Sequence, residues 1–382
     1  MVGRVVFWLS LGVILYTYVG YYLVLLVWAR LRPRQRRTEA EFLPTVSMVI
    51  AAYNEEKVLR EKLDNCRQLD YPAERIEFLF GSDGSTDATV DLIGSCGIPT
   101  VRLVAYPHRE GKARVLNKII PEARGEILIF SDANTIYQPD AVRRMVAHFA
   151  DPTVGGVCGY LRLVSPDRRA SSQGEAVYWD YENRLKRLEG TIKTVFGATG
   201  GIYAIRRELF VPLPTNKIVN DDFLVPLRVV ERGYDVVYEG RAVATEYTSP
   251  RVKGEFLRKV RIGAANFNVL PEIRSLLGPR RGYIAFGLWS HKLIRWLVPF
   301  LLIFLLAANI CARGTPFLDG FLLVQGLFYC LVVLGWMLSL LGLRLGVVTY
   351  AYYFVVIHMG LLVGFFKFLV GRQPAAWTRV ER

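Results

Sequence analysis

The placement of the apolar segments constrains the fold of this 382-residue chain more than any other feature. Four uncharged apolar runs occur, one near the N-terminus and three near the C-terminus: Val5–Ala29, Trp296–Ala312, Gly320–Leu343 and Leu345–Phe366. The second run can be extended back toward Leu288. Each approaches or exceeds the ~20 residues that a membrane-spanning helix requires. The sequence between Arg37 and Gly282 contains no comparable run. The pattern therefore predicts one span, a globular domain and three further spans.

The basic residues beside the first run predict the orientation of the chain. Five arginines follow it closely: Arg30, Arg32, Arg34, Arg36 and Arg37. Under the positive-inside rule they place the globular domain in the cytoplasm of a multi-pass protein of the cell membrane. A cleaved signal peptide is the alternative, but the run is long for a signal core and lacks a convincing small-residue cleavage site.

Four regions are predicted: an N-terminal transmembrane helix with its basic flank (1–37), a globular domain with an interfacial end (38–281), a membrane region with three apolar segments (282–371) and a basic tail (372–382). Four full spans would place both termini outside the cell. The tail nevertheless carries Arg372, Arg379 and Arg382, which favour the inside. Either the tail is an exception, or one C-terminal segment is interfacial or re-entrant.

Composition excludes several classes of protein. Hydrophobic residues make up 52% of the chain, too many for an ordinary soluble enzyme of this size. The net charge of +14 gathers beside the apolar runs, and no nucleic-acid-binding motif is present, so a membrane partner is favoured over nucleic acid. The five cysteines form no CxxC pair and the four histidines are scattered, which argues against a disulfide framework and a histidine-based metal site.

The globular domain repeats a pattern of strand, polar loop and helix. Four short apolar segments read as buried strands: Val46–Ala51, Ile76–Phe80, Val101–Ala105 and Glu126–Phe130. Such repeats predict an α/β fold with a doubly wound, mostly parallel sheet. Ligands bind such sheets beyond the carboxyl ends of the strands, where the polar loops lie.

Several polar residues in these loops are candidates for chemistry, and each has an ordinary structural alternative. Asp83 and the pair Asp132 and Asn134 follow strands, where they can cap helices or bind a nucleotide and a divalent cation. Asp222 begins a helix-like stretch, where it is stabilised by the helix dipole or serves as a general base.

Basic residues form a second group of candidates. Arg258 and Arg261 precede the C-terminal membrane region, and Lys112 lies in a Gly-Lys-Ala-Arg stretch. The structural alternative for all three is contact with lipid headgroups. The functional interpretation is recognition of a diphosphate.

Taken in order along the chain, these motifs resemble the family 2 glycosyltransferases with the GT-A fold. The similarity is to the membrane-embedded branch that contains hyaluronan, chitin, poly-N-acetylglucosamine and cellulose synthases and ceramide glucosyltransferase. It covers Pro44 to Phe267 and the flanking spans. It implies a GT-A sheet, about four transmembrane helices and a cytoplasmic catalytic domain.

The resemblance implies a role for each residue of the donor site. Tyr53 and Glu55 would meet the nucleobase and ribose, Asp83 would contact the nucleotide and Lys112 would line the donor pocket. Asp132 and Asn134 match the metal motif, which implies Mg²⁺ or Mn²⁺. Asn replaces the motif's last carboxylate, so the cation would depend more on Asp132 and on phosphate.

The acceptor side is assigned in the same way. Gly197–Gly201 corresponds to the acceptor loop, and Asp222 to the catalytic base. Arg258 and Arg261 match a basic motif whose following tryptophan is Ile262 here, which leaves long-polymer synthesis open. Trp377 resembles a tryptophan of the cytoplasmic tail.

The expected function is inverting transfer of a sugar from UDP-GlcNAc or UDP-glucose to a polysaccharide or lipid-linked acceptor, as in exopolysaccharide synthesis. Transfer of a single sugar to a lipid is one alternative. A catalytically inactive membrane protein that binds nucleotide sugars or polysaccharide is another. A nucleotide-binding oxidoreductase would need a GxGxxG turn after the first strand, and the sequence lacks one.

Overall fold

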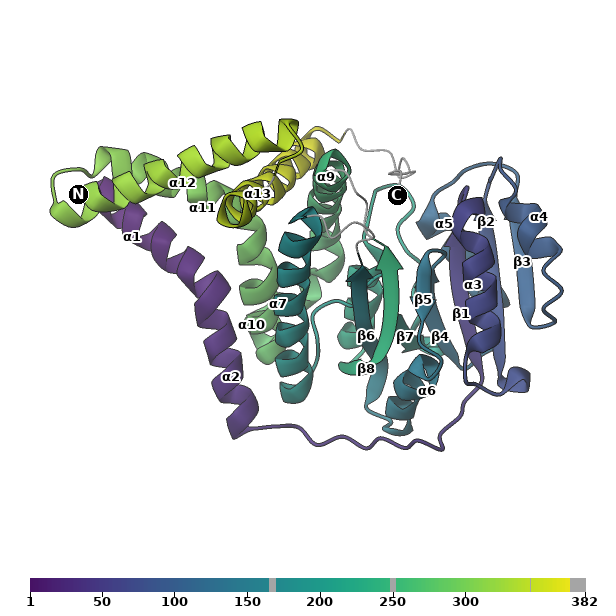
Figure 1. Ribbon diagram of the computed structural model, residues 1–382. Coiled ribbons are helices and arrows are strands. Elements are labelled where there is room, and N and C mark those ends of the chain that lie inside the picture. Colours follow the sequence, from purple (N-terminus) through teal and green to yellow (C-terminus); the bar gives the residue numbers. More distant parts are fainter. Residues whose placement is uncertain (165–169, 248–251, 344, 372–382) are drawn as a thin grey trace.

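The structure is a computed structural model that describes residues 1–164, 170–247, 252–343 and 345–371 (Figure 1). The predicted basic tail over 372–382, with Trp377, lies outside the described residues.

The described residues form one eight-stranded sheet in the order β3-β2-β1-β4-β7-β6-β8-β5. Its strands are β1 (Val46–Ala52), β2 (Ile76–Asp83), β3 (Val101–Tyr106), β4 (Ile127–Asp132), β5 (Thr135–Tyr137), β6 (Val154–Val164), β7 (Tyr203–Arg206) and β8 (Asp235–Tyr247). Strands β3, β2, β1 and β4 are mutually parallel, whereas β7 is antiparallel to β4 and β6. The predicted mostly parallel α/β sheet is confirmed.

Helices cover both faces of the sheet because the parallel strands are apolar on both sides. Met48 and Ile50 of β1 pack with α3 (Glu56–Gln68) and α6 (Ala141–Val146), whereas Val49 packs on the other face. That other face is covered by α5 (Lys112–Ile119) and α8 (Asp221–Glu231). The short α4 (Thr89–Gly94) lies between β2 and β3 in the chain.

The second and fourth predicted strands extend further than the sequence predicted. Strand β2 runs to Asp83 and β4 to Asp132, so both aspartates are the last residues of their strands instead of loop residues. Pairing continues to these positions because Asp83 is opposite Tyr106 on β3 and Asp132 is opposite Ala51 on β1. The register therefore places both carboxylates at one edge of the sheet.

Four helices are long and apolar enough to cross a membrane: Val2–Leu31, Tyr283–Cys311, Pro316–Leu340 and Gly346–Val370. The first comprises α1 (Val2–Leu15), a π-helical turn and α2 (Tyr21–Leu31), and the second comprises α10 (Tyr283–Gly287), a π-helical segment and α11 (Ile294–Cys311). The last two are α12 (Pro316–Leu340) and α13 (Gly346–Val370). The four predicted apolar segments are confirmed, and the chain is a membrane protein.

The second apolar helix begins 13 residues before the predicted Trp296, at Tyr283. The sequence pattern ended there because polar residues interrupt the run: His291, Lys292 and Arg295. All three contact Glu182 of α7 (Ala170–Ile192). Paired with that carboxylate, they do not stop the helix, since buried charges are tolerated when they are paired.

Two long helices join the sheet to the membrane helices (Figure 1). Leu185 of α7 packs against Tyr21 and Leu25 of α2. Helix α9 (Val252–Val269) packs along α13, where an added Cβ at Gly364 would lie 2.5 Å from the Val260 carbonyl oxygen. Small residues allow this close helix crossing. The globular domain is therefore fixed to both ends of the membrane region.

Candidate active site

The loops after β1 and β2 are joined by hydrogen bonds at the carboxyl edge of the sheet. Asn54 has a positive φ of 53°, which asparagine tolerates. Its amide oxygen accepts a hydrogen bond from the Thr86 backbone N–H (2.8 Å), and the Glu55 N–H donates to the Thr89 hydroxyl (2.8 Å). The Arg109 guanidinium lies 3.9 Å from the ring centroid of Tyr53. Tyr53 and Glu55, the predicted contacts of the nucleobase and ribose, thus lie on a loop that hydrogen bonds hold to its neighbour.

The carboxylate of Asp83 holds the segment that precedes α5. It accepts hydrogen bonds from the backbone N–H groups of Glu110 (2.6 Å) and Gly111 (2.9 and 3.1 Å), and Asp83 is 5% exposed. The next residue is Lys112. Asp83 therefore positions the lysine, and its contact with a nucleotide stays a prediction.

Lys112 joins two aspartates that are 89 positions apart in the sequence. Its ammonium group lies 2.9 Å from Asp132 Oδ1 and 3.2 Å from Asp221 Oδ1. Although desolvation acts in the opposite direction, the carboxylates of Asp132, Asp221 and Asp222 raise the pKa of the partly exposed Lys112 above its ordinary value. The Tyr203 hydroxyl donates to the other oxygen of Asp221 (3.0 Å). The lysine is thus a permanent cation between the β4 end and the α8 start.

Asp222 lies beside this network in the first turn of α8. Burial, followed by the charge of Asp221, raises the pKa of Asp222 to about 6, while Lys112 and Lys186 act in the opposite direction. A Cβ added to Gly200 would lie 3.2 Å from Asp222 Oδ2, so the loop Gly197–Gly201, the predicted acceptor loop, approaches this carboxylate closely. A partly exposed carboxylate with a pKa near neutrality can accept a proton during a reaction at pH 7.

The predicted basic pair lies on α9, which reaches the same region. Asn266 of α9 lies 3.2 Å from the amide of Asn220, the residue before α8. Arg258 and Arg261 are partly exposed and lie two turns and one turn earlier on that helix. Their contact with a diphosphate is not tested by this geometry and stays a prediction.

The donor set at the β4 end fits a hard divalent cation. Asp132, Asp221 and Asp222 surround one lysine, so a diphosphate would meet excess negative charge unless a cation accompanied it. The Asp132 side chain is 33% exposed and can offer an oxygen. Within the described ranges no three His, Cys, Asp or Glu side chains gather as a metal cluster. Asp132, with Asn134 two residues on, would therefore share the cation with phosphate oxygens.

Sequence reasoning missed three supporting residues. Lys62 of α3 is fully buried and donates to the Ser131 hydroxyl (2.7 Å) and the Thr135 carbonyl (2.6 Å), which holds the loop of Asp132. Burial lowers the pKa of Lys62 to about 8. Tyr203 and Lys186 were also missed. A lysine on the apolar face of an amphipathic helix was the available signal for Lys62.

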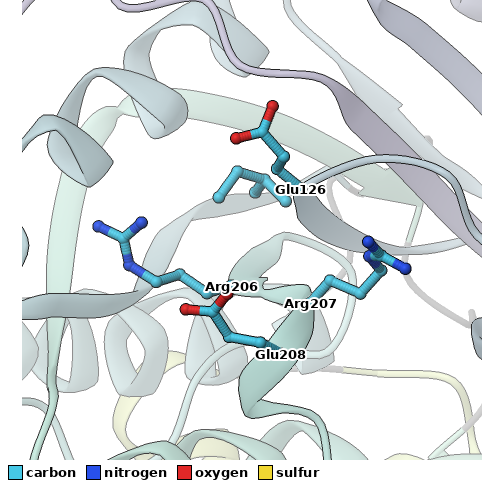
Figure 2. A pocket seen from close by; sticks show the side chains of 5 residues that line it. Glu126, Arg206, Arg207 and Glu208 are labelled. Carbon is cyan, nitrogen blue, oxygen red and sulfur yellow. The ribbon is translucent and has the colours of Figure 1, made fainter.

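A separate cavity of about 350 Å³ lies at the opposite edge of the sheet (Figure 2). It is lined by residues at the start of β4 and the end of β7: Glu126, Ile127, Arg206, Arg207 and Glu208. Its arginines point apart and bind backbone carbonyls, Arg206 that of Val154 and Arg207 that of Ala123. This cavity is distinct from the carboxylate network.

Comparison with known proteins points to one family. The sequence model described as "Glycosyl transferase family 2" matches residues 47–211. Poly-beta-1,6-N-acetyl-D-glucosamine synthases are similar: that of Staphylococcus aureus is 26% identical over 239 residues (60% of this chain, 56% of the relative), and that of Staphylococcus epidermidis is 24% identical over 245 residues (61% and 57%). The matched region thus spans little more than half of each relative.

A solved structure shares the fold. A mannosyltransferase from Pyrobaculum calidifontis, in complex with GDP-mannose and Mn²⁺, superposes with a TM-score of 0.74 over 97% of this chain and 99% of that chain, at 22% identity. The matched domain contains β1 to β4 with Asp83, Lys112 and Asp132. Over residues 47–211 the chain is therefore similar to glycosyltransferase family 2, and its sheet has the GT-A fold.

Proposed function

We propose that this chain transfers a sugar, with inversion, from a nucleoside-diphosphate sugar to a carbohydrate or lipid-linked acceptor at the cytoplasmic face of the cell membrane. Exopolysaccharide synthesis is the proposed role, and UDP-GlcNAc or UDP-glucose the proposed donor. The observation that carries this proposal is the network in which Lys112 connects the end of β4 to the acidic start of α8. The charges of Asp132, the proposed cation ligand, and Asp222, the proposed base, both act on this lysine, which supports the proposal.

In the proposed reaction Asp222 accepts the proton of an acceptor hydroxyl. The hydroxyl oxygen forms a bond to the anomeric carbon from the side opposite the diphosphate, and the bond from that carbon to the diphosphate oxygen breaks. The electron pair leaves with the nucleoside diphosphate. Lys112, Arg258 and Arg261 would stabilise the negative charge that develops there.

A bound Mg²⁺ or Mn²⁺ would supply Lewis-acid stabilisation of the leaving diphosphate. Asp132 would hold it, with Asn134 as a neutral oxygen ligand. Asp83 keeps the segment before α5 in place, so Lys112 stays within reach of both acidic loops. Tyr203 fixes Asp221, which leaves Asp222 as the carboxylate that can turn toward the acceptor.

The proposed membrane arrangement is multi-pass, with the globular domain inside. The basic run after α2 supports it, although not all of that run faces lipid. Arg34 lies 2.5 Å from Asp235 at the start of β8, and Arg36 lies 3.2 Å from the same carboxylate. These two arginines fasten the linker to the sheet. Arg30, Arg32 and Arg37 remain as the orientation signal.

A donor screen tests the proposal. The full chain in detergent is incubated with UDP-GlcNAc, UDP-glucose and GDP-mannose, with and without Mn²⁺, and release of the free nucleoside diphosphate is measured. We expect metal-dependent release from a UDP-sugar. No release from any donor would contradict the transferase and favour a binding protein. Sizing of the radiolabelled product then separates a polymer from a single sugar on a lipid.

A further inference from the structure

One row of α7 side chains turns toward the sheet beside the proposed base. Trp179, Asn183 and Lys186 are spaced by four and three residues, so they lie on the same face of the helix. Asn183 is 7% exposed and Lys186 is 3% exposed, whereas Trp179 is partly exposed. The Lys186 ammonium lies 5.7 Å from the centroid of the Trp179 ring. An aromatic ring, a buried amide and a buried cation thus lie along one face of α7.

Lys186 connects this row to Asp222. Its ammonium donates to the Thr199 hydroxyl (2.6 Å), and the next residue, Gly200, lies against the Asp222 carboxylate. The charge of Lys186 also opposes the rise in the pKa of Asp222. The row therefore begins next to the base. It reaches that base from a different helix than Lys112, which lies at the start of α5.

Asn183 is the observation that points to a ligand. Both its amide oxygen and its amide nitrogen are buried, and neither has a hydrogen-bond partner within the described part of the chain. Most buried side-chain amides in proteins form hydrogen bonds, because an unpaired amide loses its hydrogen bonds to water without compensation. An amide offers one acceptor and one donor side by side. Two adjacent hydroxyl groups of a sugar ring match this pair.

The ring beside it fits the same class of ligand. One face of a pyranose presents C–H groups, which pack on an aromatic ring, while its edge presents hydroxyls. Trp179 supplies such a ring four residues before Asn183. A ligand site that combines an apolar surface with a few polar groups is typical of small-molecule recognition. A simple lipid chain would use the ring and leave the Asn183 amide unpaired.

We propose that Trp179, Asn183 and Lys186 form the subsite for the terminal sugar of a carbohydrate acceptor, and that they direct its hydroxyl toward Asp222. This inference rests on the proposed transferase function and narrows the acceptor to a glycan. Trp179 and Asn183 bind the sugar in this arrangement. Lys186 is a positioning residue that holds the acceptor loop through Thr199.

Direct binding tests the subsite without turnover. Isothermal titration calorimetry on the full chain in detergent uses tetrasaccharides of β-linked N-acetylglucosamine, glucose and mannose as probes. We expect at least one to bind, and Asn183→Ala and Trp179→Ala each to weaken it about tenfold or more. Trp179→Phe, which keeps a ring, should retain most of the affinity. Arg184→Ala, an exposed position on the same helix, is the matched control.

Thermal stability separates ligand binding from a structural role. Because the Asn183 amide has no partner, Asn183→Ala should not lower the melting temperature without sugar. Addition of the tetrasaccharide should raise the melting temperature of the unsubstituted chain more than that of this variant. A large loss of stability in Asn183→Ala without sugar would show that the amide is structural and would overturn the proposal.

Two further results would also overturn it: no tetrasaccharide binds the unsubstituted chain, or Asn183→Ala binds as tightly as that chain. Nucleoside diphosphate release, measured separately with water as acceptor, reports on the transferase itself. Release of nucleoside diphosphate without tetrasaccharide binding would contradict the proposed subsite and leave the transferase in place. Tetrasaccharide binding without release from any donor would contradict the transferase and leave the subsite in place.

Discussion

Replacing Asp222 with asparagine should lower turnover and raise the stability of the fold. The substitution keeps the shape of the side chain and removes its capacity to accept a proton. General-base catalysis contributes about 10²–10⁴-fold, so turnover should fall by that factor. Lys112 keeps its contacts with Asp132 and Asp221, and binding of the nucleotide should therefore be nearly unchanged.

The same substitution should stabilise the fold at neutral and alkaline pH. Burial raises the pKa of Asp222 from 3.8 to about 6. Ionising it in the folded chain thus costs about 3 kcal/mol more than in the unfolded chain. Part of the side chain is open to solvent, which reduces the expected gain to about 1–2 kcal/mol. Because the raised pKa favours the protonated form, this gain is full above pH 6 and fades as the pH falls toward 3.8.

The assay pairs nucleoside diphosphate release with thermal unfolding of the detergent-solubilised chain at pH 8 and pH 4.5. We expect Asp222→Asn to lose turnover at both pH values and to gain melting temperature mainly at pH 8. Asp221→Asn is the comparison variant. Unlike Asp222→Asn, it weakens the contacts with Lys112 and Tyr203. Turnover of Asp222→Asn close to that of the unsubstituted chain would refute the assignment of the base.

Three other outcomes follow from the same contacts. Below pH 6 turnover should drop about tenfold for each pH unit, because the base must be ionised; a flat profile between pH 5 and pH 8 would contradict this. Chelating divalent cations, or Asp132→Ala in their presence, should reduce donor turnover at least about a hundredfold, and restored activity on adding Mn²⁺ to the unsubstituted chain is the control. Glu182→Gln should lower stability by about 3–5 kcal/mol, since it leaves His291, Lys292 and Arg295 without their buried carboxylate. Unfolding is compared with that of Glu61→Gln on the surface, and equal melting temperatures would show that the cluster is not needed.

The buried cluster around Glu182 and Glu189 also shows what sequence patterns cannot predict. The carboxylate of Glu189 accepts a hydrogen bond from the Tyr21 hydroxyl (2.9 Å) and lies 2.6 Å from His291 Nδ1. These residues come from α7, α2 and the segment before α11. Each alone is an ordinary polar residue, and His291 lies outside the uncharged run that begins at Trp296. Only packing of the three helices reveals that the charges compensate one another.

The sheet and the membrane helices were predictable because both follow from local patterns. Runs such as Val46–Ala51 exclude water on both faces of a strand, and uncharged stretches of about 20 residues satisfy their own backbone in lipid. The order of the strands also predicted that Asp83 and Asp132 would share one edge. These conclusions need only the period of the hydrophobic residues and the positions of the loops.

The site could be described only from the tertiary structure, because its residues are close in space and far apart in the sequence. The contact of Lys112 with Asp221 and the unpaired amide of Asn183 depend on how α5, α7 and α8 pack on one sheet. A local pattern fixes which residues are apolar and which are charged. Whether a buried charge has a partner, and how far its pKa moves, is decided by elements that meet only in the folded chain.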